Sequence, residues 1–482
     1  MHADLDCVRA VPKTAQMLHT NHVAKKLETP HVVRPAATSF ARTPKQSSLS
    51  PMFFILLAAT TFLSFFSITD VAVLYVADVA LLAIALLGFT KASPLAKKIA
   101  FFSLMHVCYA SLVAHFIHDS EPLTVVKYGG FLFSCASSFL GMLALARRSW
   151  VLVLVVYLGL AFSFLMQGLY IGALQYRGEP GWEGGLVTAV MFTTVVIGIL
   201  LGRLKERVPL WQMIVFCTLF LIDGAVLGVI SLAERDRGTA VQLMAQAASF
   251  FFVFCGPSRL KARLARSPVS AFFAAVGLAG SLVLLQAYLA LTGIIGGDVG
   301  EKIRVQWNHP AGYIVAARDE SVSAFLVGLK YPLFGIGTSS RDPEAIKELI
   351  ALDRGYKSRE GDVFFERANG YVPLHSTIGG GFARAGIVSL VYWAFILVVL
   401  WRGVLASLVA APWIAGLTTS TAVFAVFGLF FEPYVERFVF GGALAGAVYA
   451  LDLMKKTRRA TSRQQRARLD ARLSFADRRF RS

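Results

Sequence analysis

Charged residues are scarce in this 482-residue chain, because Asp, Glu, Lys and Arg together make up only 16% of it. Ordinary soluble domains carry about 25% charged residues. Apolar residues make up 56% of the chain, and the mean hydropathy is +0.62. A single water-soluble core cannot bury so much apolar surface. The composition therefore excludes an ordinary soluble protein and predicts that lipid surrounds much of the chain.

Acidic residues are the scarcer of the two charge types, with 29 Asp and Glu against 47 Lys and Arg, which gives a formal net charge of +18. Such an excess can indicate nucleic-acid binding. Here it sits at the two ends and in alternate short loops, and residues 455–482 hold eleven Lys and Arg against two Asp. We interpret this run as a basic cytoplasmic tail near anionic membrane lipids, and we predict no nucleic-acid partner.

Cysteine is also rare, and its spacing excludes two kinds of site. The five cysteines are Cys7, Cys108, Cys135, Cys217 and Cys255. No CxxC or CxxxH pattern occurs among them, which argues against a disulfide framework and a structural zinc site. We therefore expect no metal and no cofactor. Residues 1–50 are polar and basic without the apolar core of a signal peptide, so we expect a disordered cytoplasmic tail there.

Long apolar stretches dominate the rest of the chain and predict an all-α, polytopic integral membrane protein with about twelve transmembrane helices. A span needs about 20 mostly apolar residues. Nine candidates fill residues 51–292 and three fill residues 387–454. The expected spans are 51–68, 71–90, 100–117, 123–146, 150–173, 186–202, 209–232, 240–256, 269–292, 387–406, 412–431 and 438–454.

Basic residues alternate between the short loops and predict the orientation. One set of loops holds thirteen of them: Lys91, Lys97, Lys98, Arg147, Arg148, Arg203, Lys205, Arg207, Arg259, Lys261, Arg263, Arg266 and Arg402. The other set holds only Arg177, Arg235, Arg237 and Arg437. The positive-inside rule places the first set and both termini in the cytoplasm. The segment 293–386 then faces outward, into the periplasm of a Gram-negative cell.

This long polar segment is where we expect the chemistry. Val322, Phe325, Leu326 and Leu329 recur at helical spacing, so residues 319–331 are predicted to form an amphipathic helix. Pro332 should end that helix, and Gly335 and Gly337 permit a tight turn. We also expect a short helix over 343–350 and a helix from Leu374 to Leu390 that enters the next span, with three glycines near its start.

Ionisable residues within predicted spans are functional candidates by default. The candidates are Asp78, His106, His115, Lys127 and Asp223. Asp78 and Asp223 suggest either a proton relay or pairing inside the bundle. His115, His118 and Asp119 suggest either a metal site or, more simply, interfacial residues among lipid headgroups.

Two motifs in the long segment carry a family resemblance. Arg318, the amphipathic helix and Pro332-Leu-Phe-Gly335 together resemble the signature of the O-antigen ligase and polymerase superfamily. His375-Ser376, nine residues and Gly386 resemble the ligase motif of His, then Asn, Ser or Gln, then nine residues and Gly. The family usually has Gly, Thr or Tyr where this chain has Ser389, a departure that favours a divergent ligase or a related polymerase. The expected topology is also similar to that of the family.

The resemblance implies a GT-C-like fold and a metal-independent glycosyltransferase in the bacterial inner membrane. Its donor would be an undecaprenyl-pyrophosphate-linked glycan and its acceptor a hydroxyl of the lipid A-core or a similar lipid or glycan. The resemblance assigns the pyrophosphate to Arg318, since guanidinium groups bind phosphate oxygens in bidentate geometry. His375 would be the general base, because an imidazole suits proton transfer at neutral pH. Ser376 would orient the ring or the acceptor.

The sequence leaves undecided the roles of several further candidate residues and two alternative functions. Arg235 and Arg237 fit a second phosphate clamp as well as they fit a solvated turn with Glu234 and Asp236. Arg304, His309 and Arg384 are lower-ranked helpers. A polysaccharide polymerase that uses the same donor is the nearest alternative function. A flippase or other transporter is a further one, although a transporter should gather polar groups near the middle of the membrane.

Overall fold

The computed structural model of the chain describes residues 51–62, 67–69, 74–174, 182–233, 237–294, 296–308, 319–338, 374, 376–432 and 435–481. The statements below concern these residues alone. All of them belong to one compact unit, Ser47–Ser482. The predicted N-terminal tail and the predicted helix over 343–350 lie outside the described residues, as do Arg318, His375, Arg235 and His309.

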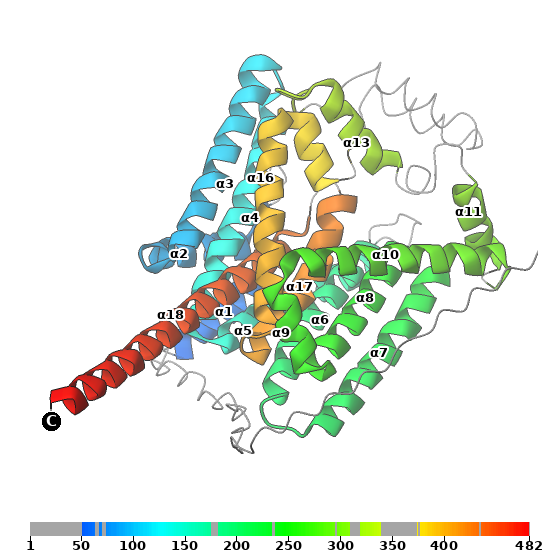
Figure 1. Cartoon of the computed structure of the whole chain (residues 1–482). Coiled ribbons are helices and arrows are strands. Elements are labelled where there is room, and N and C mark those ends of the chain that lie inside the picture. Colours follow the sequence, from blue (N-terminus) through cyan, green and yellow to red (C-terminus); the bar gives the residue numbers. More distant parts are fainter. Residues whose placement is uncertain are drawn as a thin grey trace, which may run out of the picture. The chain divides into compact units, whose positions relative to one another are not determined.

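Helices account for nearly all of the described structure (Figure 1). The first group is α1 (Pro51–Phe62), α2 (Val76–Gly88), α3 (Pro94–Leu112), α4 (Pro122–Arg148) and α5 (Trp150–Leu174). The second is α6 (Trp182–Leu204), α7 (Leu210–Ala233), α8 (Arg237–Cys255), α9 (Ser258–Arg266) and α10 (Pro268–Leu291). The third is α11 (Gly297–Trp307), α13 (Asp319–Lys330), α16 (Thr377–Ser407), α17 (Pro412–Phe431) and α18 (Arg437–Arg481). Short turns η2 (Phe89–Lys91) and η3 (Val113–Ile117) extend α2 and α3.

The all-α prediction is confirmed apart from one small antiparallel hairpin, β1 (Ser67–Thr69) with β2 (Leu74–Tyr75). Five helical stretches are long and apolar enough to cross a membrane: Pro94–Ile117, Pro122–Arg148, Thr377–Ser407, Pro412–Phe431 and Arg437–Asp470. Several shorter apolar helices accompany them, among them Trp150–Met166 and Thr188–Leu204. The described part therefore has the helices of a multi-pass membrane protein.

Two boundaries differ from the predicted ones, and a third agrees. The basic segment after the eighth predicted span forms the helix α9, because Arg259, Arg263 and Arg266 recur at helical spacing on its exposed side. The basic C-terminal tail continues α18 as helix to Arg481, since it contains no Pro or Gly that would end a helix. Helix α16 begins at Thr377, close to the predicted start at Leu374 of a helix that enters the next span.

The core forms where α16, α17 and α18 meet α4 and α6, and its centre is aromatic. Trp393, Phe438 and Phe440 are almost completely buried there. Small residues bring the helices close together. A Cβ added at Gly416 of α17 would lie 2.0 Å from the carbonyl oxygen of Gly198 in α6. Such close backbone approach replaces the hydrophobic driving force that lipid cannot supply between helices.

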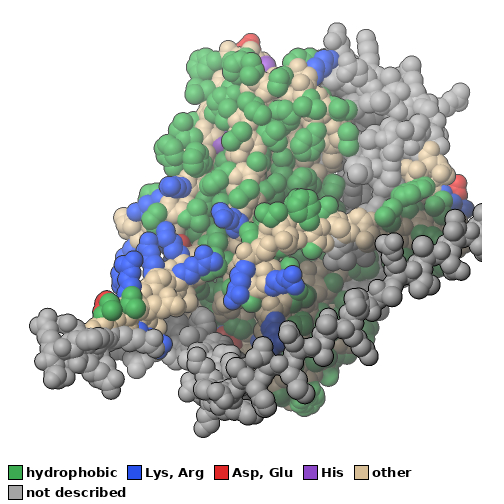
Figure 2. Space-filling model, in the orientation of Figure 1, with side chains coloured by type: hydrophobic (Ala, Val, Ile, Leu, Met, Phe, Trp, Pro, Cys, Tyr) green, Lys and Arg blue, Asp and Glu red, His purple; other side chains and the backbone are tan. Residues whose placement is uncertain are grey.

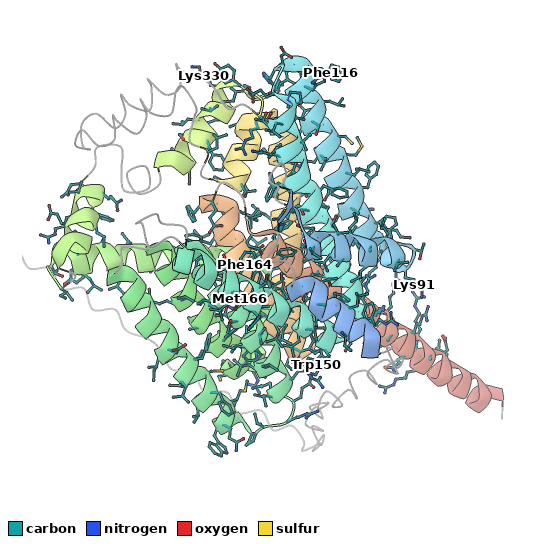
Figure 3. All side chains as sticks on the ribbon, turned by 180° about the vertical axis from the view of Figure 1, so that it is seen from behind. Lys91, Phe116, Trp150, Phe164, Met166 and Lys330 are labelled. Atoms are coloured by element: carbon teal, nitrogen blue, oxygen red, sulfur yellow. The ribbon has the colours of Figure 1, made fainter. Side chains whose placement is uncertain are left out.

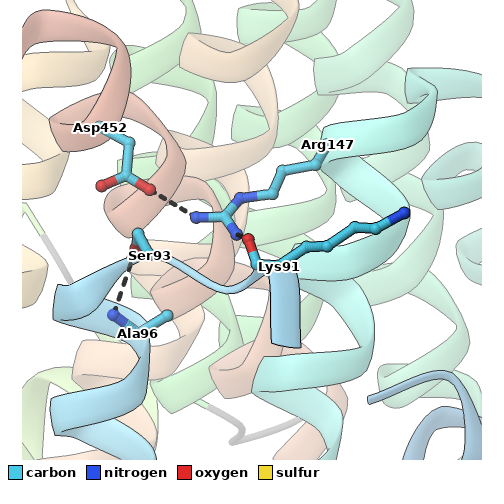
Figure 4. Close-up of polar contacts among 5 residues, drawn as sticks. All are labelled: Lys91, Ser93, Ala96, Arg147 and Asp452. Carbon is cyan, nitrogen blue, oxygen red and sulfur yellow. Dashed lines mark hydrogen bonds and ion pairs between the residues drawn. The ribbon is translucent and has the colours of Figure 1, made fainter. Parts of the chain in front are cut away.

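Basic side chains mark one end of the helices. Lys91 and Trp150 lie at this end, and Phe116 and Lys330 lie at the opposite end (Figure 3). Arg147 at the end of α4 connects two neighbours here (Figure 4): its guanidinium donates to the carbonyl oxygen of Lys91 at 3.2 Å and pairs with Asp452 of α18 at 2.5 Å. Lys and Arg side chains gather around α9 and along α18, while the face above them is mostly hydrophobic (Figure 2).

The contact between Gly198 and Gly416 yields a stability prediction. Replacing Gly416 by Leu should lower the free energy of unfolding by about 3 kcal/mol or more, because overpacking costs about 1–3 kcal/mol even where only side chains must move. The matched control is Gly277→Leu in α10, where an added Cβ meets nothing within 4 Å. Thermal unfolding in detergent measures both. Equal midpoints for the two variants would contradict the predicted close packing of α6 and α17.

Candidate functional site

The turn predicted after Pro332 is present and directly follows α13. It covers residues 331–338, and Gly335 and Gly337 adopt left-handed backbone conformations with φ of 69° and 79°. The amide of Gly335 closes the turn on the carbonyl oxygen of Tyr331 at 2.9 Å. Both glycines are needed here, since residues with a Cβ rarely adopt such φ values.

Helix α16 contains a break that sequence reasoning did not predict. Gly386 has φ 68° and ψ −157°, so a short helix, 377–385, ends there and a long helix begins at Ile387. Figure 1 shows the two parts of α16 running in different directions from this point. A break leaves the last carbonyl groups of the first helix and the first amides of the second without partners inside the helix. Such groups are costly to bury unpaired.

The turn supplies those missing partners. The amide of Ile336 donates to the Ala383 carbonyl oxygen at 2.7 Å, and the amide of Gly337 donates to that of Arg384 at 3.2 Å. In return, the amide of Ile387 donates to the carbonyl oxygen of Pro332 at 2.7 Å. The two sequence motifs, about fifty residues apart, are thus joined by three backbone hydrogen bonds.

The fit between the turn and the break leaves no room for side chains at the glycines. A Cβ at Gly386 would lie 2.1 Å from the carbonyl oxygen of Leu333. A Cβ at Gly335 would lie 2.3 Å from the carbonyl oxygen of Ala383. The last glycine of the ligase-like motif therefore has a structural role: it breaks α16 and receives the turn.

Helix α3 and the connection that follows it hold the other side of the turn. The Tyr109 hydroxyl donates to the Leu333 carbonyl oxygen at 3.1 Å, and Nε2 of His118 donates to that of Phe334 at 3.3 Å. A Cβ at Gly337 would lie 2.6 Å from the Cβ of His118. His118 therefore supports the turn. Within the described residues, no three His, Cys, Asp or Glu side chains are placed to hold a metal ion, including those around His115 and Asp119.

Helix α13 forms as predicted but buries a different face. Ala324 and Val327 are almost completely buried, whereas Leu326 and Leu329 of the predicted apolar face are 42% and 67% exposed. The face with small residues is buried because α16 approaches α13 closely. A Cβ at Gly328 would lie 2.2 Å from the Phe382 ring. Shape, rather than hydrophobicity alone, selects the buried face.

The packing of α13 on the first part of α16 is parallel. Ala324 and Phe325 meet Gly379, and Gly328, further along α13, meets Phe382, further along α16. The N-terminal ends of the two helices therefore lie at the same end of the pair. In the sequence, Arg318 directly precedes α13, and His375 stands two residues before the start of α16. Both residues lie outside the described part of the chain.

Ser376 anchors the N-terminal end of α16. Its hydroxyl accepts from the amide of Gly379 at 3.0 Å as the N-cap and donates to the carbonyl oxygen of Leu429 in α17 at 3.2 Å. The side chain is completely buried. Thr377 continues the contact, because its hydroxyl accepts from the amide of Val435 at 2.8 Å and donates to the Glu432 carbonyl oxygen at 3.1 Å. The predicted role of Ser376 in orienting an acceptor stays a prediction.

The structure places the predicted helper arginines apart from one another. Arg384 is buried beside the break, with its guanidinium 5.2 Å from the centre of the Tyr128 ring. Arg304 lies on α11, 39% exposed and 3.9 Å from Glu301, and α11 lies at the end of α10 in Figure 1. Arg237 begins α8, but its side chain is outside the described residues. Of the two whose side chains the structure describes, Arg384 lies at the break and Arg304 does not.

A buried polar cluster next to the break includes His106, which the sequence singled out alone. Its Nε2 lies 2.9 Å from the Ser389 hydroxyl, and its ring stacks on Tyr392 with centroids 4.3 Å apart. The Tyr392 hydroxyl lies 3.0 Å from that of Ser103. Ser103 is three residues before His106, and Tyr392 is three after Ser389, so each pair lies on one helix face. The sequence spacing of these two pairs could have indicated that polar side chains share one face of each helix.

Asp78 and Asp223, for which a proton relay was one of two readings, lie on different helices and are not in contact in the described structure. Asp78 in α2 pairs with Arg437 at the start of α18, with the Arg437 Nη1 3.4 Å from the Asp78 Oδ2. Asp223 lies on an exposed face of α7. Asp78 is therefore paired inside the helical bundle, which was one of the two readings of the sequence. This pairing also explains why a basic residue stands at position 437, among the loops that otherwise carry little positive charge.

Comparison with known proteins adds no family to this geometry. No protein-family model matches the chain, and no curated protein matches it.

The break at Gly386 gives a testable expectation. Gly386→Ala should lower the free energy of unfolding by about 3 kcal/mol or more, because it adds a collision with Leu333 to the backbone strain of a left-handed residue, itself about 1–3 kcal/mol. Gly293→Ala is the control, since Gly293 has φ 79° but an added Cβ meets nothing within 4 Å. Thermal unfolding in detergent compares them. If both variants lose the same stability, the turn does not dock on the break as described.

Proposed function

We propose that this chain is a membrane glycosyltransferase of the O-antigen ligase type. It transfers a glycan from undecaprenyl pyrophosphate to an acceptor hydroxyl at the outer face of the bacterial inner membrane. The observation that carries the proposal is the docking of the Pro332–Gly337 turn on the break at Gly386. The two segments that resemble the family motifs form one assembled unit rather than two separate stretches of loop.

The parallel packing of α13 and α16 supports the assignment of the donor site. Two helix N-termini at the same end of the pair present amides and partial positive charge, which favour a phosphate group. Arg318 adjoins one of these ends in the sequence, and His375 adjoins the other. An arginine and an imidazole next to two helix N-termini suit a reaction in which pyrophosphate leaves and a hydroxyl loses its proton.

Each residue then has a distinct role. Arg318 neutralises the leaving pyrophosphate, and His375 accepts the proton of the acceptor hydroxyl as its oxygen attacks the anomeric carbon. Ser376 holds the end of α16 through its two hydrogen bonds, and His375 directly precedes it in the sequence. Arg384 stays beneath the turn against Tyr128, where it fixes the break rather than the substrate.

The topology that belongs to this proposal has twelve spans, both termini in the cytoplasm and residues 293–386 outside. Its support is the basic end of the helices, where Lys91 and Arg147 lie, opposite the end with Lys330 and the turn (Figure 3). In this topology α9 lies along the cytoplasmic surface with its three arginines toward the lipid headgroups.

Cysteine labelling tests the topology. In a variant without the five native cysteines, Lys357→Cys should react with a membrane-impermeant maleimide once the outer membrane alone is opened. Arg263→Cys on α9 is the matched control and should react only after the inner membrane is permeabilised. Labelling of position 357 only after that second step would reverse the orientation and remove the proposed outer active site.

A reconstituted transfer assay tests the chemistry. His375→Ala should lower turnover by about 10²–10⁴-fold, the usual contribution of a general base. Arg318→Ala should cost about 2–5 kcal/mol, as for a lost partner of a buried charge, and Arg318→Lys should also be impaired because lysine lacks the fork. Arg259→Ala on α9 is the control and should transfer normally.

Two results would contradict this account of the chemistry. Normal transfer by His375→Ala or Arg318→Ala would remove the proposed roles. Activity that is abolished by a chelator and restored by a divalent ion would exclude the metal-independent mechanism.

A further inference from the structure

Glu436 stands at the start of α18, and the sequence did not single it out. Its Oε2 accepts a hydrogen bond from the amide of Val439 at 2.6 Å, which caps the first turn of the helix. The side chain is partly buried. A carboxyl group at a helix N-terminus is ordinarily an exposed acid stabilised by the helix dipole. The surroundings of Glu436 are different.

The adjacent cation, Arg437, forms an ion pair with Asp78. Arg437 directs Nη1 toward Asp78 at 3.4 Å and toward the Ser134 hydroxyl, also at 3.4 Å. The Asp78 side chain is 4% exposed, so this pair is shielded from water. No ion pair between Glu436 and a described cation is present. Glu436 is therefore near a buried carboxylate, and the Arg437 guanidinium that acts on Glu436 is ion-paired with that carboxylate.

The other titratable groups around Glu436 do not supply positive charge. Cys135 of α4 and Tyr157 of α5 lie within electrostatic range, and the Tyr157 hydroxyl donates to the carbonyl oxygen of Phe438 at 3.0 Å. From α16, Thr377 contributes a hydroxyl that contacts the backbone of Val435. Thiol, phenol and hydroxyl groups are neutral near pH 7. The proton on Glu436 is consequently favoured by its environment.

Burial is the main cause of this preference, and it raises the pKa of Glu436 to about 7. The amide of Val439 and the guanidinium of Arg437 act in the opposite direction, while Asp78 adds to the rise. Glu436 thus changes charge in the range where cells operate, whereas an ordinary glutamate is fully ionised there.

The position of Glu436 connects it to the end of α16. The preceding residue, Val435, donates its amide to the Thr377 hydroxyl at 2.8 Å, and Thr377 follows Ser376 directly. Ionised Glu436 is a stronger acceptor for the Val439 amide than protonated Glu436. A change of its charge would therefore change the hydrogen bonding of the first turn of α18, and Val435, which directly precedes Glu436, is bonded to Thr377 at the start of α16.

We propose that Glu436 is a proton-binding residue whose charge state adjusts the N-terminal end of α16. Proton binding at Glu436 is independent of the reaction, but its effect on transfer rests on the proposed function. Glu436 is a positioning residue in this account: it acts through Val435 and Thr377 and makes no contact with the donor or the acceptor.

The first experiment uses no substrate. Folding raises the pKa of Glu436, so the folded state binds this proton more tightly than the unfolded state does. The stabilisation is present below the unfolded pKa of about 4.3 and is lost as the pH rises through about 7. The unfolding temperature of the full-length protein in detergent should therefore fall less between pH 5 and pH 8 in Glu436→Gln than in the wild type. Glu206→Gln, which removes an exposed carboxylate paired with Arg203, should fall as the wild type does.

The second experiment measures the ratio of Glu436→Gln to wild-type transfer rates at several pH values. If the charge of Glu436 adjusts the site, this ratio should change by about fivefold between pH 6 and pH 8. A purely structural defect would lower the rate by the same factor at every pH.

The outcomes separate the two proposals. An identical fall of unfolding temperature in Glu436→Gln and the wild type would overturn proton binding at Glu436. A pH-independent rate ratio would overturn its coupling to the site. If the wild-type protein transfers no glycan at all, the proposed function fails, and the unfolding experiment still decides whether Glu436 binds the proton.

Discussion

The break in α16 imposes the constraint on which the rest of the candidate site depends. A helix that stops and restarts among apolar residues exposes backbone groups that neither lipid nor a dry core can satisfy. The turn 331–338 resolves this, since its amides and one carbonyl group complete the bonds of Ala383, Arg384 and Ile387. Backbone hydrogen bonds therefore hold the turn after α13 against α16. Side-chain identity matters mainly at the glycines, where a larger residue would block this approach.

Much of the local structure follows from residue types and could be predicted. Pro332 ends α13, Gly335 and Gly337 form the turn, and most of the apolar stretches become helices close to the expected limits. The break at Gly386 could not be predicted, because a lone glycine in an apolar helix is compatible with an unbroken span. Its left-handed conformation is tolerated only because a segment about fifty residues away supplies partners. Pairings of that kind leave no periodic trace in the sequence.

In the candidate site, too, the sequence identified individual polar residues but not the residues that they contact. Asp78 and His106 were identifiable as polar residues in apolar stretches, but their partners Arg437 and Ser389 are hundreds of positions away. Arg437 was read as a loop charge, and its ion pair makes it part of the interior. Glu436 escaped notice because an acid just before a helix is ordinary in sequence. Only its enclosure beside the Asp78–Arg437 pair distinguishes it.

The start of α16 is the point where these interactions meet. Ser376 binds Leu429 of α17, and Thr377 binds the connection between α17 and α18. Gly379 packs on α13, and the first part of α16 ends at the break on which the turn docks. The start of α16 is therefore held by elements that come from distant parts of the chain. Loss of activity after a substitution at Ser376 therefore does not by itself assign a chemical role, because its hydroxyl already serves both as donor and as acceptor within the protein. Substitutions at His375 and Arg318, which adjoin the starts of α16 and α13 in the sequence, therefore test the proposed chemistry more directly than substitutions at Ser376.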